Sequence, residues 1–353
     1  MPGRILLAII FGSALISLYL CACSASGPDT SSGIGERTLR MAISPYQDTA
    51  FLVNAKKLGL EKKYGIKLAL LTFPWEETLP AVASAGETVD ASYGNMTEYL
   101  TKSVNLNGQR DDPVLFIYPM WVFKGSAFVT FNPKVPEINS ETIKDPVLIK
   151  KFLSFKIGAP KNSSNQMLLF LLAKRAGIKF SDLSIIDTPV NDGLLAAENG
   201  NLDIAGAGGT QRIEAEKQHG RVVLDMDTFG IGDIDGFICK ESVYKKRKRD
   251  IDSLIRMQFD CVNYVLSDID HHSDTTLAYL RDHASTKHTL AEFKRALSFQ
   301  YFLRSTQEVE EEIISDKGKY SIARHVAIIN QYLMEIGVAN SPRPVPKIVN
   351  LGT

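Results

Sequence analysis

The chain has 353 residues, 44% of them hydrophobic and 23% charged, with 40 Lys plus Arg against 40 Asp plus Glu. These values are typical of a globular protein large enough for two modest domains. The formal net charge of zero excludes the basic surplus that a nucleic-acid-binding protein needs, so we expect no nucleic-acid partner.

The N-terminus has the pattern of an export signal. Arg4 is followed by an apolar run over 5–20, which is shorter than the ~20 residues of a comfortable membrane span. The run ends in Leu20-Cys21-Ala22-Cys23, which resembles the bacterial lipobox. We therefore predict a lipoprotein signal peptide over 1–22 and acylation of Cys23, with palmitate as the expected acyl chain. A linker of small residues is expected over 23–37. A signal anchor, or a secretory signal that is cleaved elsewhere, is the alternative.

Strands and helices alternate through the next 80 residues. Strands are expected over 39–43, 66–72, 91–93 and 114–118, with one helix running from the first loop to Lys63 and another after residue 72. This pattern predicts lobe 1 over 38–120. Alternating strands and helices predict a parallel-rich sheet with helices on both faces.

The same order of elements returns later in the chain. Strands are expected over 126–131, 155–159, 183–187, 204–205 and 221–224, which places lobe 2 over 121–228 after a crossing at 119–125. A return crossing at 230–233 then leads back to lobe 1 over 229–353. Apolar spacing predicts helices from 242 to 337, packed on lobe 1. The fold class is thus α/β, with two lobes and a ligand cleft at the strand carboxyl ends between them.

Aromatic and polar residues follow the expected strands of lobe 1. Such pairs suit a small organic ligand that is stacked and hydrogen-bonded, although interlobe packing is the alternative. A carboxylate at Glu76 would oppose a simple anion and suit an amine or amide donor. The candidates are Tyr46, Gln47, Trp75, Glu76, Tyr93, Asn95 and Thr97, with Trp121 as a possible wall near the crossing.

In lobe 2 the candidates stand at predicted helix starts. Ser163 and Ser164 directly precede an apolar helix, where they can cap it and where free N–H groups can bind an anion beside Lys161. Gly209 and Thr210 follow another strand, so that Thr210 can cap the next helix or meet a ligand. If the serines act at the helix end alone, replacing both by Ala weakens binding and leaves the melting temperature nearly unchanged.

The sequence has no motif for catalysis, phosphate-loop binding or zinc. We expect no cofactor, no metal and no catalytic residue. Cys239 and Cys261 remain after the signal, and the sequence leaves open whether they pair or stay as buried thiols.

Several segments resemble the periplasmic solute-binding proteins of ABC importers, in the alkanesulfonate, taurine, nitrate and thiamine-pyrimidine-precursor lineage. The segments are 59–66, 86–90, 157–164, 171–178 and 199–203. The resemblance implies a two-lobe, type II-like periplasmic-binding-protein fold that closes on a small solute and delivers it to an ABC permease. It also implies that the loops at 46, 75, 93–97, 163–164 and 208–210 form the site.

The leading hypothesis is a monomeric, lipid-anchored, non-enzymatic solute-binding protein that faces the periplasm or cell exterior of a bacterium. Its solute would be a sulfonate-like anion or a heteroaromatic compound. A sensing or scaffolding lipoprotein on the same fold is a second hypothesis. A pyrimidine-synthase-like enzyme of this lineage is a third, which the lack of a Cys cluster in the lobes disfavours.

Overall fold

The computed structural model describes residues 38–84, 88–107, 112–284 and 287–351. The predicted signal peptide, Cys23 and the linker lie outside the described residues. Residues 36–353 make up one compact unit. Within the described ranges, no helix is both long and apolar enough to cross a membrane.

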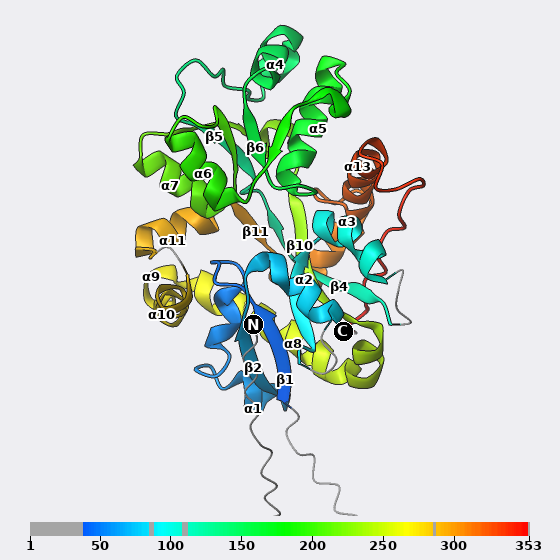
Figure 1. The fold of residues 1–353 in the computed structure, drawn as a ribbon. Helices are drawn as coiled ribbons and strands as arrows, with labels where there is room; N and C mark the ends of the chain where they lie inside the picture. The colour runs from blue at the N-terminus through cyan, green and yellow to red at the C-terminus, as the bar shows by residue number, and fades with distance from the viewer. Residues whose placement is uncertain (1–37, 85–87, 108–111, 285–286, 352–353) are drawn as a thin grey trace, which may run out of the picture. The chain divides into compact units, whose positions relative to one another are not determined.

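The first sheet has six strands in the order β11-β4-β10-β3-β1-β2 (Figure 1). Its parallel part pairs β1 with both β2 and β3, and antiparallel strands β10, β4 and β11 extend it. The strands are β1 (Thr38–Ile43), β2 (Lys67–Thr72), β3 (Ala91–Asn95), β4 (Val114–Phe123), β10 (Asp233–Lys240) and β11 (Gln300–Phe302), and its helices are α1 (Leu60–Tyr64), α2 (Trp75–Ser84) and α3 (Met96–Asn107).

The second sheet has five strands in the order β7-β6-β8-β5-β9, and α4, α5, α6 and α7 flank it (Figure 1). Strand β6 pairs in parallel with β7 and β8, whereas β5 is antiparallel to β8 and β9. The elements are β5 (Ala127–Thr130), β6 (Ile157–Ala159), β7 (Ile185–Asp187), β8 (Ile204–Ala207), β9 (Arg221–Asp225), α4 (Pro146–Leu153), α5 (Ser164–Ala176), α6 (Val190–Glu198) and α7 (Gly209–Lys217), with short 3-10 turns η2 (Thr142–Lys144), η3 (Phe180–Asp182) and η4 (Asp227–Phe229). Two mixed sheets with flanking helices confirm the predicted α/β, two-lobe architecture.

The chain passes from the first sheet to the second between β4 and β5, and returns between β9 and β10. Strand β4 runs to Phe123 because β10 and β11 pair with its last residues on both sides. Trp121, which the sequence analysis set at the start of lobe 2, therefore belongs to the first sheet. Only residues 124–126 separate the two sheets at this crossing.

The single helix expected up to Lys63 is wrong. The structure has a 3-10 turn, η1 (Ala50–Asn54), and then the short helix α1. Gly59 separates them with φ of 66°, a left-handed conformation that glycine adopts without a steric penalty. A continuous helix cannot pass through such a residue.

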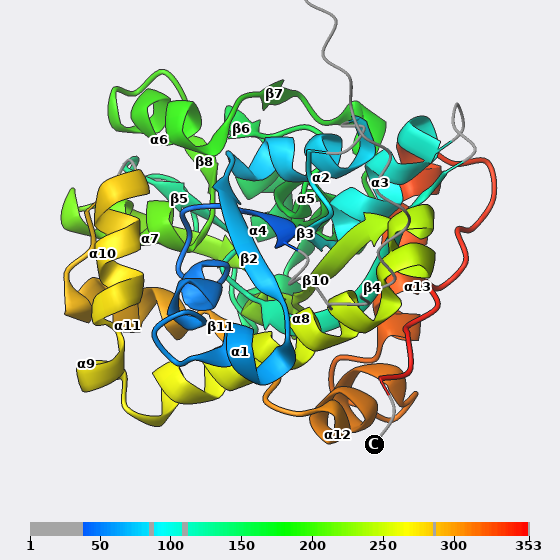
Figure 2. The same cartoon turned by 90° about the horizontal axis from the view of Figure 1, so that it is seen from below.

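The C-terminal region contains α8 (Glu241–Ser267), α9 (Ile269–His272), α10 (Asp274–His283), α11 (Leu290–Leu297), α12 (Thr306–Val309), the π-helical turn η5 (Glu310–Ile314) and α13 (Ile322–Glu335). Helix α8 packs on β10 and β4 of the first sheet (Figure 2). The expectation that the whole region packs on lobe 1 is wrong, because α11 contacts α7 and α13 contacts α5. Strand β11 interrupts the predicted helices, and the C-terminal region thus braces both lobes.

Candidate ligand-binding cleft

A cavity of about 210 Å³ lies between the two lobes, where the parallel strands of both sheets end. In the first lobe its wall comes from the residues after β1, from the start of α2, from α3 and from the ends of β3 and β4. In the second lobe it comes from the residues after β6, β7 and β8. The lining residues are Tyr46, Gln47, Asp48, Trp75, Glu76, Asn95, Glu98, Lys102, Phe123, Ser126, Pro160, Lys161, Ser163, Ser164, Asn165, Val190, Gly208, Gly209, Thr210, Gln211 and Asp235.

The loop after β1 is held by hydrogen bonds that present Tyr46 and Asp48 to the cavity. The Thr49 hydroxyl donates to the Ser44 carbonyl, and the Tyr46 N–H donates to the same oxygen at 2.8 Å. Asp48 Oδ2 accepts a hydrogen bond of 2.8 Å from Gln300 Nε2, which comes from β11. The loop is thus fixed by its own backbone and by the C-terminal region.

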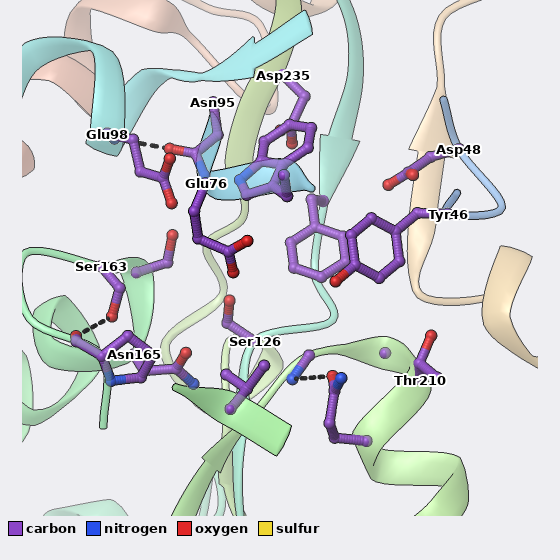
Figure 3. Close-up of a pocket in the computed structure, with 18 of the residues that line it drawn as sticks. Tyr46, Asp48, Glu76, Asn95, Glu98, Ser126, Ser163, Asn165, Thr210 and Asp235 are labelled. Atoms are coloured by element: carbon purple, nitrogen blue, oxygen red, sulfur yellow. Dashed lines mark hydrogen bonds between the residues drawn. The ribbon is translucent and has the colours of Figure 1, made fainter. Parts of the chain in front are cut away.

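Four carboxylates line the cavity, against two lysines. One of the lysines, Lys102, lies 3.3 Å from Glu98 on the same helix. Figure 3 shows Glu76, Glu98, Asp48 and Asp235 around the pocket, each from a different element. The wall contributed by lobe 1 is therefore acidic.

Burial and the neighbouring negative charges shift the pKa values of the groups in this acidic wall. Burial raises the pKa of Asp48 to about 6, with the Gln300 hydrogen bond acting in the opposite direction. Burial also raises the pKa of Glu98, against the effect of Lys102. The pKa of Tyr46 is raised to about 12, first by burial and then by the negative charges of Glu76 and Asp48. Added negative charge is thus disfavoured at this wall.

Asp235 is the most buried of the four carboxylates. It lies on β10, between Asn95 of β3 and Trp121 of β4, and its residue is only 3% exposed. Burial, together with the charges of Asp233, Asp48 and Glu98, holds its pKa well above the usual range. Its Oδ2 atom has no hydrogen-bond partner in the described part of the protein. Buried polar atoms without partners are rare, because each costs about 1–3 kcal/mol or more.

The wall of lobe 2 is built on the start of α5. Ser163 caps the helix by accepting from the Gln166 N–H, and its hydroxyl donates to the Pro160 carbonyl at 2.6 Å. Asn165 donates to the carbonyls of Ala127 and Ala207, which belong to β5 and β8. These contacts fix the helix start against its own sheet.

Ser164 connects lobe 2 to the return crossing. Its hydroxyl donates to Asp233 Oδ2 at 2.6 Å, and His325 Nε2 of α13 lies 2.8 Å from Asp233 Oδ1. Burial alone would raise the pKa of Asp233, but the hydrogen bonds from His325 and Ser164 hold it below its usual value. The carboxylate stands between the imidazole and the hydroxyl, so the His325 imidazole does not contact Ser164, and the order of the three groups differs from that of a Ser–His–Asp triad. Ser164 therefore has a structural role that the sequence analysis did not expect.

The start of α7 completes the cavity. Gly208 precedes the helix, and its N–H donates to Gln211 Oε1 at 3.1 Å. Thr210 is therefore not the capping residue, although it lines the cavity. A side chain at Gly209 would lie 3.1 Å from the Phe299 ring, so a glycine lets the two segments approach.

Most of the residues expected from the sequence line the cavity: Tyr46, Gln47, Trp75, Glu76, Asn95, Ser163, Ser164, Gly209 and Thr210. Three others lie in the interior and do not line it. Tyr93 is fully buried and donates to Gln258 of α8, and Trp121 is fully buried within β4. Thr97 is also fully buried, and its carbonyl accepts a hydrogen bond from the Thr101 hydroxyl of the same helix. We therefore leave these three out of the proposed site.

Sequence reasoning missed the acidic residues Asp48, Glu98 and Asp235 and the aromatic Phe123. Asp48 directly follows Gln47, the last candidate residue that the sequence analysis named in this loop. Asp235 belongs to a strand that runs antiparallel to its neighbours, so that its beginning reaches the edge where the parallel strands end. A signal existed, because Asp233 and Asp235 follow Gly230 and Gly232 at the predicted return crossing.

Comparison with known proteins supports the fold through structure alone. The sequence matches no protein-family model and no curated protein. Among solved structures, the aliphatic sulphonate binding protein SsuA from Escherichia coli has a TM-score of 0.63 at 15% identity, covering 87% of this chain and 95% of that one. SsuA from Xanthomonas axonopodis pv. citri, bound to MOPS, has a TM-score of 0.63 at 14% identity and covers 86% of this chain and 94% of that one.

A third similar structure is the nitrate-binding protein NrtA from Synechocystis PCC 6803. Its TM-score is 0.55 at 15% identity, with 72% of this chain and 68% of that one covered. The chain has the periplasmic-binding-protein fold. This confirms the fold that the sequence resemblance implied.

Proposed function

We propose that this chain is the solute-binding component of an ABC importer, which captures a small organic solute between its two lobes and delivers it to a membrane permease. The observation that carries the proposal is the interlobe cavity, lined by aromatic, polar and charged residues from both lobes. Ligand contacts to both lobes favour the closed arrangement over an open one, since only the closed one provides all of them.

The proposal includes a lipid anchor and a monomeric binding protein. The motif Leu20-Cys21-Ala22-Cys23 is the basis for the anchor. Acylation at Cys23, followed by the small-residue linker, would tether the body to a bacterial membrane, where it would face the periplasm or the cell exterior. Mass spectrometry of the protein extracted from membranes tests this: a mature chain that begins at an acylated Cys23 is expected, and an unmodified N-terminus contradicts the anchor.

A thermal-shift screen on residues 36–353 tests solute capture. The panel contains sulfonates, inorganic oxyanions, pyrimidines, and aliphatic and aromatic amines. At least one compound should raise the melting temperature, because a ligand that binds only the folded state stabilises it. If no compound in the panel does so, the capture of a small organic solute is contradicted.

Uptake distinguishes transport from sensing. Bacteria that lack this chain should lose high-affinity uptake of the compound that stabilises the protein most. Unchanged uptake would instead favour the sensing or scaffolding hypothesis.

A further inference from the structure

The four carboxylates of the cavity outnumber the two lysines that line it. Lys102 pairs with Glu98, and the remaining lysine, Lys161, is exposed at the lobe 2 side. Like charges that line one cavity repel one another and repel an anionic ligand, and this repulsion strengthens where water is excluded. A cation would remove both costs.

The strongest single observation is the free oxygen of Asp235. Its Oδ2 atom is buried without a hydrogen-bond partner among the described residues, and Asp235 is one of the pocket-lining residues labelled in Figure 3. A second acceptor, Gln47 Oε1, is also buried and has no hydrogen-bond partner among the residues that the structure describes. Gln47 lines the same cavity. An ammonium group has three N–H donors and no acceptor, so it is a suitable partner for such acceptors.

The aromatic residues fit the rest of such a ligand. Tyr46, Trp75 and Phe123 line the cavity, and each is only partly buried, so that ring surface remains for a ligand to cover. Aromatic faces attract cations and also stack on flat or apolar groups. Within the described ranges, no group of three or more His, Cys, Asp or Glu side chains is placed to hold a metal ion. The wall therefore suits an organic cation.

We propose that the cavity binds a small organic cation, an ammonium group carried on an aromatic or apolar body, with Asp235 as its ion-pair partner. The inference rests on the proposed solute-binding function and narrows its solute class. Of the two classes expected from the sequence, a sulfonate-like anion is disfavoured. A flat ring remains compatible, provided that it carries a positive charge.

Binding of a cation should release a proton. Burial and the neighbouring carboxylates raise the pKa of Asp235 in the free protein, and an ammonium ion beside it favours the ionised form and so lowers that pKa. Affinity for an amine should therefore rise with pH between the lower pKa that Asp235 has in the complex and the higher pKa that it has in the free protein. The groups that share this environment, and that also shape the pH profile, are Asp48, Glu76, Glu98, Lys102, Asp233 and Tyr46.

Isothermal titration calorimetry at pH 7.5 on residues 36–353 tests the inference with matched probes. Phenethylamine, 2-phenylethanol and 2-phenylethanesulfonate share one body and differ in charge, and benzylamine and tryptamine vary the body. An amine should bind at least tenfold more tightly than the alcohol, and the sulfonate should not bind. Titrations repeated over a series of pH values, each in two buffers of different ionisation enthalpy, should show proton release on amine binding in the pH range where free Asp235 is still protonated.

Variants locate the effect. Asp235→Asn should weaken amine binding at least tenfold, abolish the proton release and leave the affinity for the alcohol unchanged. Glu76→Gln, at an exposed position of the cavity wall where folding is not at risk, should weaken amine binding several-fold. Asp282→Asn, an exposed carboxylate on α10, is the matched control and should change nothing.

Three outcomes overturn the inference: no amine of the three binds, the sulfonate binds as tightly as the amine, or Asp235→Asn leaves amine affinity unchanged. Tight sulfonate binding would leave the proposed solute-binding function intact and refute only the cationic class. Failure of the whole thermal-shift panel would refute both.

Discussion

Removing the imidazole of His325 should destabilise the protein strongly. His325 Nε2 lies 2.8 Å from Asp233 Oδ1, with the two side chains 6% and 0% exposed. Removing the hydrogen-bonded partner of a buried carboxylate typically costs about 3–5 kcal/mol, because the carboxylate charge stays buried with less compensation. Asp233 keeps the hydrogen bonds from the Ser164 hydroxyl and the Thr97 N–H, so we expect about 3 kcal/mol for His325→Ala.

A surface pair of equal length provides the control. His271 Nδ1 lies 2.8 Å from Asp268 Oδ2, with side chains 80% and 45% exposed. Exposed pairs contribute little because water screens them, so His271→Ala should leave stability nearly unchanged. Urea unfolding, followed by tryptophan fluorescence, measures both variants. If His325→Ala costs no more than His271→Ala, the argument that burial gives the Asp233 pair its strength is refuted.

Three further predictions concern pH, fluorescence and thiols. Because the folded state favours protonated Asp48, this group should lower stability by on the order of 3 kcal/mol as pH rises from about 4 through its folded pKa of about 6. In urea unfolding, Asp48→Asn should make the loss of stability with pH shallower, with the contributions of Glu98 and Asp235 left in place; an unchanged slope contradicts the raised pKa of Asp48. A bound compound should change the tryptophan emission of the Trp121→Phe variant, which keeps Trp75 at the cavity. It should leave the emission of the Trp75→Phe variant unchanged, because that variant keeps only the buried Trp121; the reverse pattern would place the ligand elsewhere. A thiol reagent should modify Cys239 and Cys261, which are free and buried, only after unfolding, and rapid modification of the native protein would contradict their burial.

The serine prediction made from the sequence needs revision. Ser164 donates to a buried carboxylate, so Ser164→Ala should lower stability, whereas Ser163 mainly caps α5. Loss of binding in a double variant would thus mix two effects. Ser163→Ala alone is the cleaner test of the helix end: its melting temperature should fall only slightly, and an unchanged affinity for the best-binding compound would exclude a ligand role for this hydroxyl.

The sequence predicts the fold and part of the site for a local reason. Tyr46 and Trp75 follow strands whose periodicity is readable from a few neighbouring residues, and the carboxyl ends of parallel strands share one edge of the sheet. The same reasoning was wrong for Tyr93, because this residue lies two residues before the end of β3 and is buried within the sheet. Asn95, the last residue of that strand, reaches the cavity.

The remaining parts depend on contacts between distant segments. Trp121 is buried because β11, from the C-terminal region, extends the sheet beside β4. Asp235 reaches the cavity because β10 returns antiparallel between β3 and β4. His325 meets Asp233 across 92 residues of chain. No local pattern of apolar spacing encodes such pairings, so they required the structure.

In the proposed function, a bound solute bridges the two lobes and holds them closed. Electron–electron distance measurements on the double variant Lys62→Cys and Lys151→Cys, spin-labelled on α1 of the first lobe and α4 of the second, test it directly. The variant is made on residues 36–353, which leave out Cys21 and Cys23; both labelled positions are exposed, whereas Cys239 and Cys261 are buried and should stay unlabelled. The compound that stabilises the protein most should shift the distance distribution toward shorter values. A saturating compound that leaves the distribution unchanged would contradict closure of the lobes around a solute.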